Sequence, residues 1–342
     1  MTGELVFITG GSGHLGYRVI VDALQAGYRV RAAIRSQSKA SQILSAPSIK
    51  AINPGDRLEF VEVPDLLADS AYDEAVKDAV YIIHCASPIT SSYAQGTDME
   101  EHFVTPAVKG TLSILTAAQR ASTVKRVVIT SSVVAVIAFK DFTSGKIHTV
   151  HNEKSRTAFL HGPYHSVMEA YSASKIKALN ETEAWIEQEK PSFDVVNILP
   201  GFIIGQNELV TDVKDAMYGT NKTVLGPVTG GGDGSKVPGT SIHLLDVALA
   251  HVKALDPKVP AQAYALASEG VKGTDWATSW DIVSKEFPDA VKSGVLSQGK
   301  TAMLPLPFDE SRSEELLGFK FRSFEEQVKD VVGRYIELKT AV

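Results

Sequence analysis

A glycine-rich turn between two regular elements constrains this chain more than any other feature. The apolar run Leu5-Val6-Phe7-Ile8 leads into Thr9-Gly10-Gly11-Ser12-Gly13-His14-Leu15-Gly16, and a segment of helical periodicity then runs to Gly27. In such a strand, turn and helix, glycines let a diphosphate approach the free backbone N–H groups at the helix N-terminus, where the helix dipole favours an anion. We therefore predict a dinucleotide site here. Its predicted contacts are Gly10, Ser12, Gly13, His14, Leu15 and Gly16.

The end of the next predicted strand, at 28–35, indicates which dinucleotide binds. In sites selective for NAD this strand ends in an acid that binds the ribose 2′-hydroxyl. Here no Asp or Glu occurs between Asp22 and Asp56, and Arg35 stands at the strand end with Lys39 four residues later. A guanidinium and an ammonium suit a 2′-phosphate, which an acid would repel. We therefore predict NADPH/NADP with Arg35 and Lys39 at its 2′-phosphate; the alternative is a solvated basic loop.

Strands and helices alternate along the first two hundred residues. Further strands are predicted at 58–63, 80–85, 124–132 and 193–199, with helices at about 70–79, 98–121 and 168–190. This alternation predicts an α/β fold with a doubly wound parallel (Rossmann) sheet, in which ligands bind at the carboxyl ends of the strands. The candidate cofactor contacts at those ends are Asp65, Leu66, Ala86, Ser87 and Thr130.

The alternation weakens beyond residue 205. At 342 residues the chain exceeds the size at which a single core stops growing, so two lobes are expected. We predict an NADP-binding Rossmann domain at 1–204, joined by about 241–268. A smaller C-terminal α/β substrate lobe is predicted from 205–240 and 269–342, with helices near 274–286, 309–317 and 323–339.

A tyrosine and a lysine form the candidate catalytic pair. Tyr171 and Lys175 stand four residues apart in a predicted helix, which places both side chains on one face. An unperturbed tyrosine has a pKa of about 10, too high for an efficient acid or base near neutrality. A nearby ammonium and a nicotinamide ring both favour phenolate, so we expect a lowered pKa for Tyr171. The spacing alone is common; its position after a strand ending in Ser131 and Ser132 is what distinguishes it.

The motifs together resemble those of the extended short-chain dehydrogenase/reductases, above all the dihydroflavonol-reductase-like group of NADPH-dependent aldehyde and ketone reductases. One departure is Lys109, where many relatives have asparagine, and the C-terminal third resembles the group only in general style. The matching segments are TGGSGHLG at 9–16, the basic segment at 33–39, HCASP at 84–88, TSS at 130–132, YSASK at 171–175 and LPGFIIG at 199–205.

This resemblance implies a role for each candidate residue. Tyr171 donates a proton to a carbonyl oxygen as hydride arrives from the nicotinamide, while Lys175 lowers the tyrosine pKa and holds the ribose hydroxyls. Ser132 hydrogen-bonds the substrate oxygen, with Ser131 the lesser candidate. The residues expected to border the nicotinamide are Pro200, Gly201 and Ile203, and those expected to line the substrate pocket are Val133 and Phe202.

The expected activity is NADPH-dependent reduction of a ketone or aldehyde. One alternative is a nucleotide-sugar epimerase or dehydratase of the same fold, although the basic residues after the second strand argue against its NAD-using members. Another is a non-enzymatic NADP-sensing regulator. Such regulators commonly lack the tyrosine–lysine pair, which this chain has.

Composition and charge bound the partners. A net charge of −6 argues against nucleic acid or an anionic membrane, and a single cysteine, Cys85, suits a reducing compartment. No apolar run approaches the roughly 18 residues of a membrane span, and the N-terminus resembles no signal peptide. We expect a cytoplasmic monomer or homodimer with a small-molecule carbonyl substrate, and neither nucleic acid nor membrane as partner.

Histidines offer a weaker signal. His84 lies inside an apolar predicted strand and is expected to be a core residue whose polar atoms are satisfied. His148, His151, His161 and His165 lie close together in sequence, but no cysteine accompanies them. A surface or substrate-contacting loop is therefore the preferred interpretation of 148–165, and no metal site is predicted.

Overall fold

The computed structural model describes residues 3–68, 70–89, 93–145 and 149–340. The chain divides into two compact units. The first unit comprises Met1–Val136, Arg156–Leu199 and Ala248–Tyr264, and the second comprises Ile137–Ser155, Pro200–Val247 and Ala265–Val342. The assignment of the cofactor to one domain and of the substrate to the other stays a prediction.

A seven-stranded sheet confirms the predicted α/β Rossmann fold. Its order is β10-β6-β5-β4-β1-β2-β3, and the neighbours from β3 to β6 run parallel. The order reverses between β1 and β4, so the carboxyl ends of these two strands border the position where such sheets bind ligands. The strands are β1 Leu5–Thr9, β2 Arg29–Ile34, β3 Leu58–Glu62, β4 Tyr81–His84, β5 Arg126–Thr130, β6 Asp194–Pro200 and β10 Ala263–Leu266.

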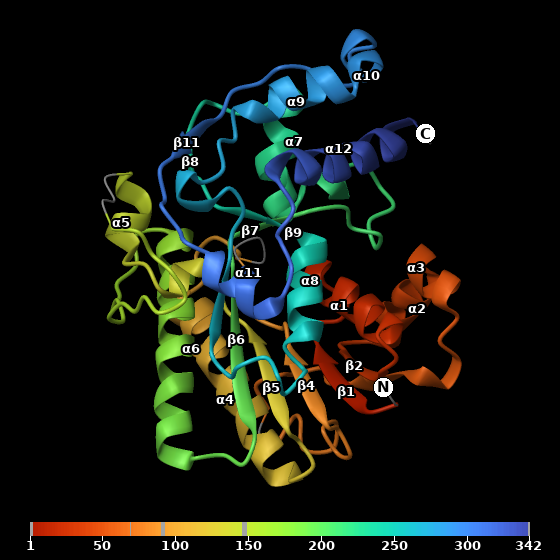
Figure 1. Ribbon diagram of the computed structural model, residues 1–342, viewed down its shortest axis with the longest axis vertical. Coiled ribbons are helices and arrows are strands. Elements are labelled where there is room, and N and C mark those ends of the chain that lie inside the picture. The colour runs from red at the N-terminus through yellow and green to blue at the C-terminus, as the bar shows by residue number, and fades with distance from the viewer. Residues whose placement is uncertain (1–2, 69, 90–92, 146–148, 341–342) are drawn as a thin grey trace. The chain divides into compact units, whose positions relative to one another are not determined.

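Helices lie on both sides of these strands, with α4 and α6 on one side and α1 on the other (Figure 1). The apolar residues of α4 pack against β4 and β5 in a buried cluster around Tyr72. The helices are α1 His14–Gln25, α2 Gln37–Ser45, α3 Pro47–Ile52, α4 Thr105–Ala121, α6 Val167–Glu189 and α8 Leu244–Lys253; shorter turns are η1 Gly55–Arg57, the π-helical η3 Glu100–Val104 and η4 Val133–Ala135.

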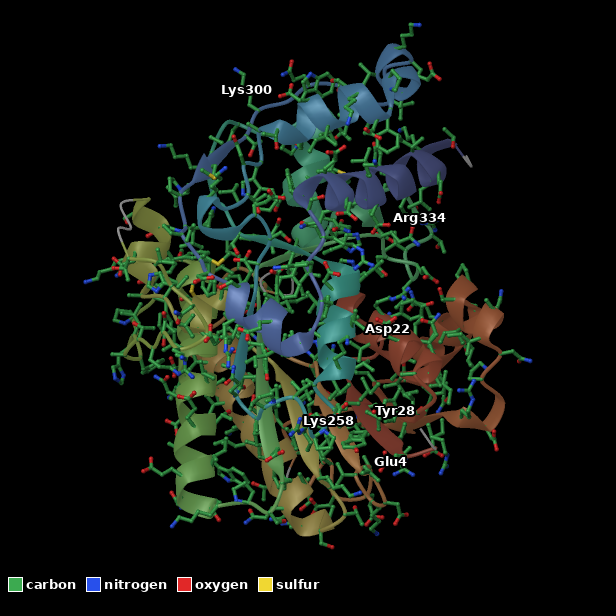
Figure 2. The ribbon with its side chains drawn as sticks, in the orientation of Figure 1. Glu4, Asp22, Tyr28, Lys258, Lys300 and Arg334 are labelled. Atoms are coloured by element: carbon green, nitrogen blue, oxygen red, sulfur yellow. The ribbon has the colours of Figure 1, made fainter. Side chains whose placement is uncertain are left out.

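The opposite ends of the strands are remote from the motifs. Figure 2 shows Glu4 just before β1 and Tyr28 just before β2, while Asp22 lies on α1. Tyr28 packs edge-on against Tyr81 at the start of β4, with 5.9 Å between ring centroids. Tyr28 and Tyr81 thus pack together at the amino ends of β2 and β4, whereas the glycine turn follows the carboxyl end of β1.

The structure corrects the sequence-based elements in two places. The helix predicted at 70–79 is wrong: the described part of that segment is a series of turns, in which Ser70 and Asp78 have positive φ and Val76 N–H donates to the Tyr72 carbonyl. The segment after β2 is not a loop, since α2 and α3 occupy it. A short helix, α5 Phe139–Ser144, precedes the segment 148–165.

Arg126 at the start of β5 holds the amino end of the sheet together. Its guanidinium is buried, donates to the carbonyls of Ala254, Asp256 and Val259, and pairs with Asp194 of β6. We expect Arg126→Met to lower the free energy of unfolding by about 2–3 kcal/mol, because buried acceptors lose a charged donor. Chemical denaturation measures this, with the exposed Arg120→Met as control at under about 1 kcal/mol. Equal effects in the two variants would contradict this assignment.

The second unit has its own core. Trp276 is fully buried among apolar side chains of α7, α9 and α12, and Trp280 is partly buried against the same cluster. Two small parallel sheets pair β7 with β9 and β8 with β11. The elements are α5, β7 Phe202–Ile204, η5 Asp215–Met217, η6 Gly219–Asn221, α7 Lys222–Val228, β8 Lys236–Pro238, β9 Ser241–His243, η7 Gly270–Lys272, α9 Thr278–Glu286, α10 Pro288–Lys292, β11 Ala302–Leu304, α11 Ser311–Leu317 and α12 Phe324–Thr340.

Candidate active site

The turn between β1 and α1 is closed by contacts that only glycine permits. Gly13 N–H donates to the Gly10 carbonyl at 2.9 Å. A Cβ on Gly16 would stand 2.2 Å from that carbonyl oxygen, and Gly10 has φ +74°. Side chains at these two positions would force the turn open, so the glycine spacing is a requirement of the backbone path.

The N-terminus of α1 is suited to a diphosphate. Gly13 is the N-cap, no side chain caps the helix, and its first turn contains no acid. Ser12 and His14 are half-buried at the turn and Leu15 is buried beneath it. The helix therefore presents backbone N–H groups and its positive dipole end to an anion, as the dinucleotide prediction requires.

The two basic candidates lie at the edge of the same sheet. Arg35 follows the last residue of β2 and is exposed, and Lys39 is exposed on the first turn of α2. Lys39 Nζ donates to Gln42 Oε1 at 3.1 Å, and no ion pair engages either residue in the described chain. Both cations are thus available to an external anion, although their cofactor contact stays a prediction.

After β3, Asp65 caps a turn by accepting the Leu67 N–H at 2.9 Å, while Leu66 is half-buried against the cluster around Tyr72. The role of Asp65 as a cofactor contact stays a prediction. Asp65 is exposed, so the carboxylate remains open to solvent.

The turn after β4 is tied to β1. Cys85 N–H donates to the Thr9 carbonyl at 3.3 Å, and Ala86 N–H donates to Thr9 Oγ1 at 3.2 Å. The same hydroxyl hydrogen-bonds His84 Nδ1 at 2.9 Å. Burial lowers the pKa of His84 to about 3, so this ring is a neutral core group, as predicted.

A capping arrangement sets the start of α6 and hence the position of Tyr171. Ser166 is the N-cap and its hydroxyl accepts the Glu169 N–H at 3.1 Å, while Glu169 Oε2 accepts the His165 N–H at 2.6 Å. This Ser-x-x-Glu pattern satisfies two otherwise unpaired donors. It places Tyr171 and Lys175 on the first turns of α6, one turn apart.

Tyr171 and Ser132 meet at the carboxyl end of β5. Ser132 is the N-cap of η4, where its Oγ accepts the Val134 N–H at 3.4 Å, and its hydroxyl lies close enough to Tyr171 to favour the phenolate. Burial nevertheless raises the pKa of Tyr171 to about 12, more than the nearby Ser132 lowers it. In this structure desolvation of the phenolate dominates the pKa of Tyr171. The lowering expected from an ammonium together with a nicotinamide ring stays a prediction. At neutral pH the Tyr171 hydroxyl keeps its proton.

Lys175 is buried, and its pKa is lowered. Its Nζ donates to Ser87 Oγ at 2.9 Å and lies 5.7 Å from the centroid of the Tyr171 ring. Burial lowers the pKa of Lys175 to about 8. Its ammonium is thus directed to the turn after β4 as well as toward the tyrosine.

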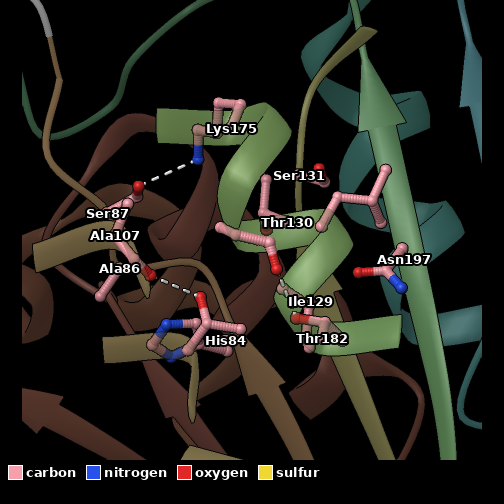
Figure 3. Close-up of a pocket in the computed structure, with 13 residues that line it drawn as sticks. His84, Ala86, Ser87, Ala107, Ile129, Thr130, Ser131, Lys175, Thr182 and Asn197 are labelled. Carbon is pink, nitrogen blue, oxygen red and sulfur yellow. Dashed lines mark hydrogen bonds between the residues drawn. The ribbon is translucent and has the colours of Figure 1, made fainter. Parts of the chain in front are cut away.

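A small cavity lies beside Lys175 (Figure 3). Its volume of about 10 Å³ is close to what one water molecule requires. Thr130 lines it and hydrogen-bonds His251 Nε2 at 2.8 Å, and Ser131 is buried with its N–H bonded to the Ile198 carbonyl. The other polar residues of its wall are His84, Ser87, Thr111, Thr182 and Asn197.

The residues predicted to border the nicotinamide and the substrate lie in both units. Val133, in the first unit, is buried in η4. In the second unit, Phe202 packs edge-on against Trp276 at 5.7 Å, and a Cβ on Gly201 would stand 2.5 Å from Thr240 Oγ1. Roles at the nicotinamide or the substrate stay predictions for Val133, Pro200, Gly201, Phe202 and Ile203.

The four clustered histidines do not gather at one site in the described part of the chain. His148 lies outside the described residues, His151 is half-buried in a bridge to Phe308, and His165 is exposed, as is His161. Over the described ranges no three His, Cys, Asp or Glu side chains gather as metal ligands. Lys109 is exposed on α4. Among the helices described, none is both long and apolar enough to span a membrane.

Two contacts of the site could not be predicted from the sequence. The bond between Lys175 and Ser87 joins residues 88 apart, and that between Thr130 and His251 joins residues 121 apart. Ser87 was identified only as a neighbour of the cofactor, and His251 was not singled out. No local signal exists for either contact; only the strand order brings them together.

A parallel sheet with a glycine turn after β1, serines after β5 and a tyrosine–lysine pair on α6 defines an oxidoreductase of the extended short-chain dehydrogenase/reductase type. The chain belongs to the NAD dependent epimerase/dehydratase family, whose model matches residues 6–267. The resemblance stated from the sequence is thereby confirmed. A nicotinamide dinucleotide as cofactor follows from the family together with the glycine turn.

The chain is similar to reductases and to an epimerase/dehydratase over nearly its whole length. The chain is 39% identical to Ketoreductase CTB6 of Cercospora nicotianae, over 99% of this chain and 96% of that protein. It is 35% identical to NAD-dependent epimerase/dehydratase ALT6 of Alternaria alternata, over 95% of this chain and 96% of that protein. Among solved structures, yeast methylglyoxal/isovaleraldehyde reductase Gre2 complexed with NADPH is 25% identical, with a TM-score of 0.84 and coverage of 99% and 100% of the two chains.

Proposed function

We propose that this protein is an NADPH-dependent carbonyl reductase, which converts a ketone or aldehyde into a secondary or primary alcohol. The observation that carries the proposal is the meeting of Ser132, Tyr171 and Lys175 at the carboxyl ends of the strands. The similarity to a ketoreductase over nearly the whole chain supports it.

Three side chains act on the carbonyl group in the proposed reaction. Bound NADPH supplies a hydride to the carbonyl carbon. Tyr171 Oη donates its proton to the carbonyl oxygen, which completes the alcohol, and the raised pKa keeps that proton in place near neutrality. The Ser132 hydroxyl hydrogen-bonds the same oxygen, and the Lys175 ammonium offsets the charge left on the tyrosine.

Cofactor selectivity is proposed to come from Arg35 and Lys39. The two exposed cations at the end of β2 and the start of α2 favour a 2′-phosphate. We expect NADPH to be oxidised much faster than NADH in the presence of aldehydes, β-keto esters, aryl ketones or diketones. Arg35→Ala should raise the KM for NADPH about tenfold or more while leaving that for NADH nearly unchanged. The absorbance of the reduced nicotinamide measures both, and equal use of the two cofactors by the unmodified protein would refute the selectivity.

The family match keeps one alternative open. A nucleotide-sugar epimerase or dehydratase would recycle a tightly held NAD in each turnover, and the family model that matches this chain is named for such enzymes. The basic residues at the end of β2 favour the reductase. Release of NAD from the denatured purified protein, with no consumption of added NADPH, would favour the alternative.

A further inference from the structure

The turn after β4 contributes a side chain whose task the scheme above does not include. Ser87 Oγ accepts a hydrogen bond from Lys175 Nζ at 2.9 Å (Figure 3). We propose that Ser87 is a positioning residue, which holds the Lys175 ammonium at the carboxyl end of β4 and so determines how Lys175 acts on Tyr171. The inference rests on the proposed carbonyl reduction, because it assigns a task within the same site.

The surroundings of Lys175 show why such a partner matters. The titratable groups that face the ammonium are His84 and Cys85 at the end of β4 and Tyr171 on α6. All three are uncharged near neutrality, since burial lowers the pKa of His84 to about 3 and raises those of Cys85 and Tyr171 to about 12. Across the described ranges no carboxylate pairs with Lys175, and Ser87 is its one hydrogen-bond acceptor.

The turn that carries Ser87 is rigid enough for this task. Thr9 receives the backbone N–H groups of both Cys85 and Ala86. A Cβ on Gly10 would stand 2.9 Å from the Ala86 nitrogen, so the glycine turn itself packs against this segment. Pro88 restricts the backbone of Ser87 to extended conformations. The Ser87 hydroxyl is therefore held in a fixed position. The turn that carries Ser87 contacts both the glycine turn and, through this hydroxyl, Lys175.

The test compares variants at two hydroxyls of the same cavity wall. Ser87→Ala removes the acceptor, and Ser87→Thr restores a hydroxyl. Thr111→Val is the matched control, because Thr111 lines the same cavity but donates only to the Ala107 carbonyl of its own helix, at 2.8 Å. The Lys175 ammonium is titrated by NMR of Cε-labelled lysine, with its signal assigned by its loss in Lys175→Met.

The expected result is specific to Ser87. Loss of a hydrogen bond to the charged form should lower the proton affinity of Lys175 about tenfold or more in Ser87→Ala, which moves its titration at least about one pH unit below that of the unmodified protein. The alkaline limb of the pH profile of kcat should move by the same amount, with the KM for the carbonyl substrate nearly unchanged. Ser87→Thr should recover both, and Thr111→Val should alter neither.

Two outcomes would overturn the inference. One is an unmoved Lys175 titration in folded Ser87→Ala protein, and the other is an equal shift in Thr111→Val. If Ser87→Ala does not fold, Ser87→Cys carries the same test, because a thiol of similar size is a weak acceptor. The titration requires no turnover, so a protein that reduces no carbonyl refutes the proposed reaction, while an unmoved titration in an active enzyme refutes only the positioning role.

Discussion

Tyr171→Phe is expected to lower the kcat of carbonyl reduction by about 10²–10⁴-fold, with NADPH binding nearly unchanged. The variant deletes only the oxygen that carries the transferred proton and keeps the ring that lies 5.7 Å from Lys175 Nζ. Single-turnover absorbance measures the chemical step, and quenching of protein fluorescence by NADPH measures binding. Full activity in this variant would disprove the assigned general acid.

The chain offers a matched control for that variant in Tyr72. Its hydroxyl is buried in the cluster between α4 and the sheet, and it finds no hydrogen-bond partner within the described part of the chain. Tyr72→Phe makes the same chemical change and removes an unsatisfied polar group, so stability should be equal or slightly higher. Turnover should be unchanged. A comparable loss of activity in both variants would indicate a general effect of removing buried hydroxyls.

Lys175→Met is expected to abolish most turnover, at least about a hundredfold, and at the same time to raise stability at pH 7 by up to about 3 kcal/mol. The gain follows from the lowered pKa of Lys175, about 8 when folded against about 10.5 when exposed to solvent. Between these values the unfolded chain binds more protons than the folded one, so stability of the unmodified protein rises with pH. The advantage of methionine is therefore full below about pH 8 and disappears as the pH approaches 10.5.

Urea denaturation at pH 7 and pH 10 measures this dependence. Lys109→Met serves as the control, because Lys109 is exposed on α4 and its replacement should change the free energy of unfolding by less than about 0.5 kcal/mol. A Lys175→Met protein that is less stable than the unmodified one at pH 7 would show that the buried ammonium is well compensated, contrary to its surroundings of neutral groups.

The features that could be predicted from the sequence are those encoded by short-range spacing. The glycine turn at 9–16 stands between an apolar run and a helical period, so its position at the first carboxyl end follows directly. Tyr171 and Lys175 are four apart in a helix whose Ser166 cap is itself a local pattern. The helix predicted at 70–79 is wrong because a short-range pattern does not report tertiary packing. The pattern is compatible with a helix, but Ser70 and Asp78 take positive φ and Tyr72 is buried in the core.

By itself, the sequence determined the order of strands and helices, the glycine turn and the shared face of Tyr171 and Lys175. Only the tertiary structure decided what surrounds these groups. It placed Ser87 against Lys175 across 88 residues and surrounded Tyr171 with enough protein that its pKa rises. The physical reason is that periodicity depends on bonded neighbours, whereas desolvation and hydrogen-bond partners depend on which strands lie side by side in the sheet.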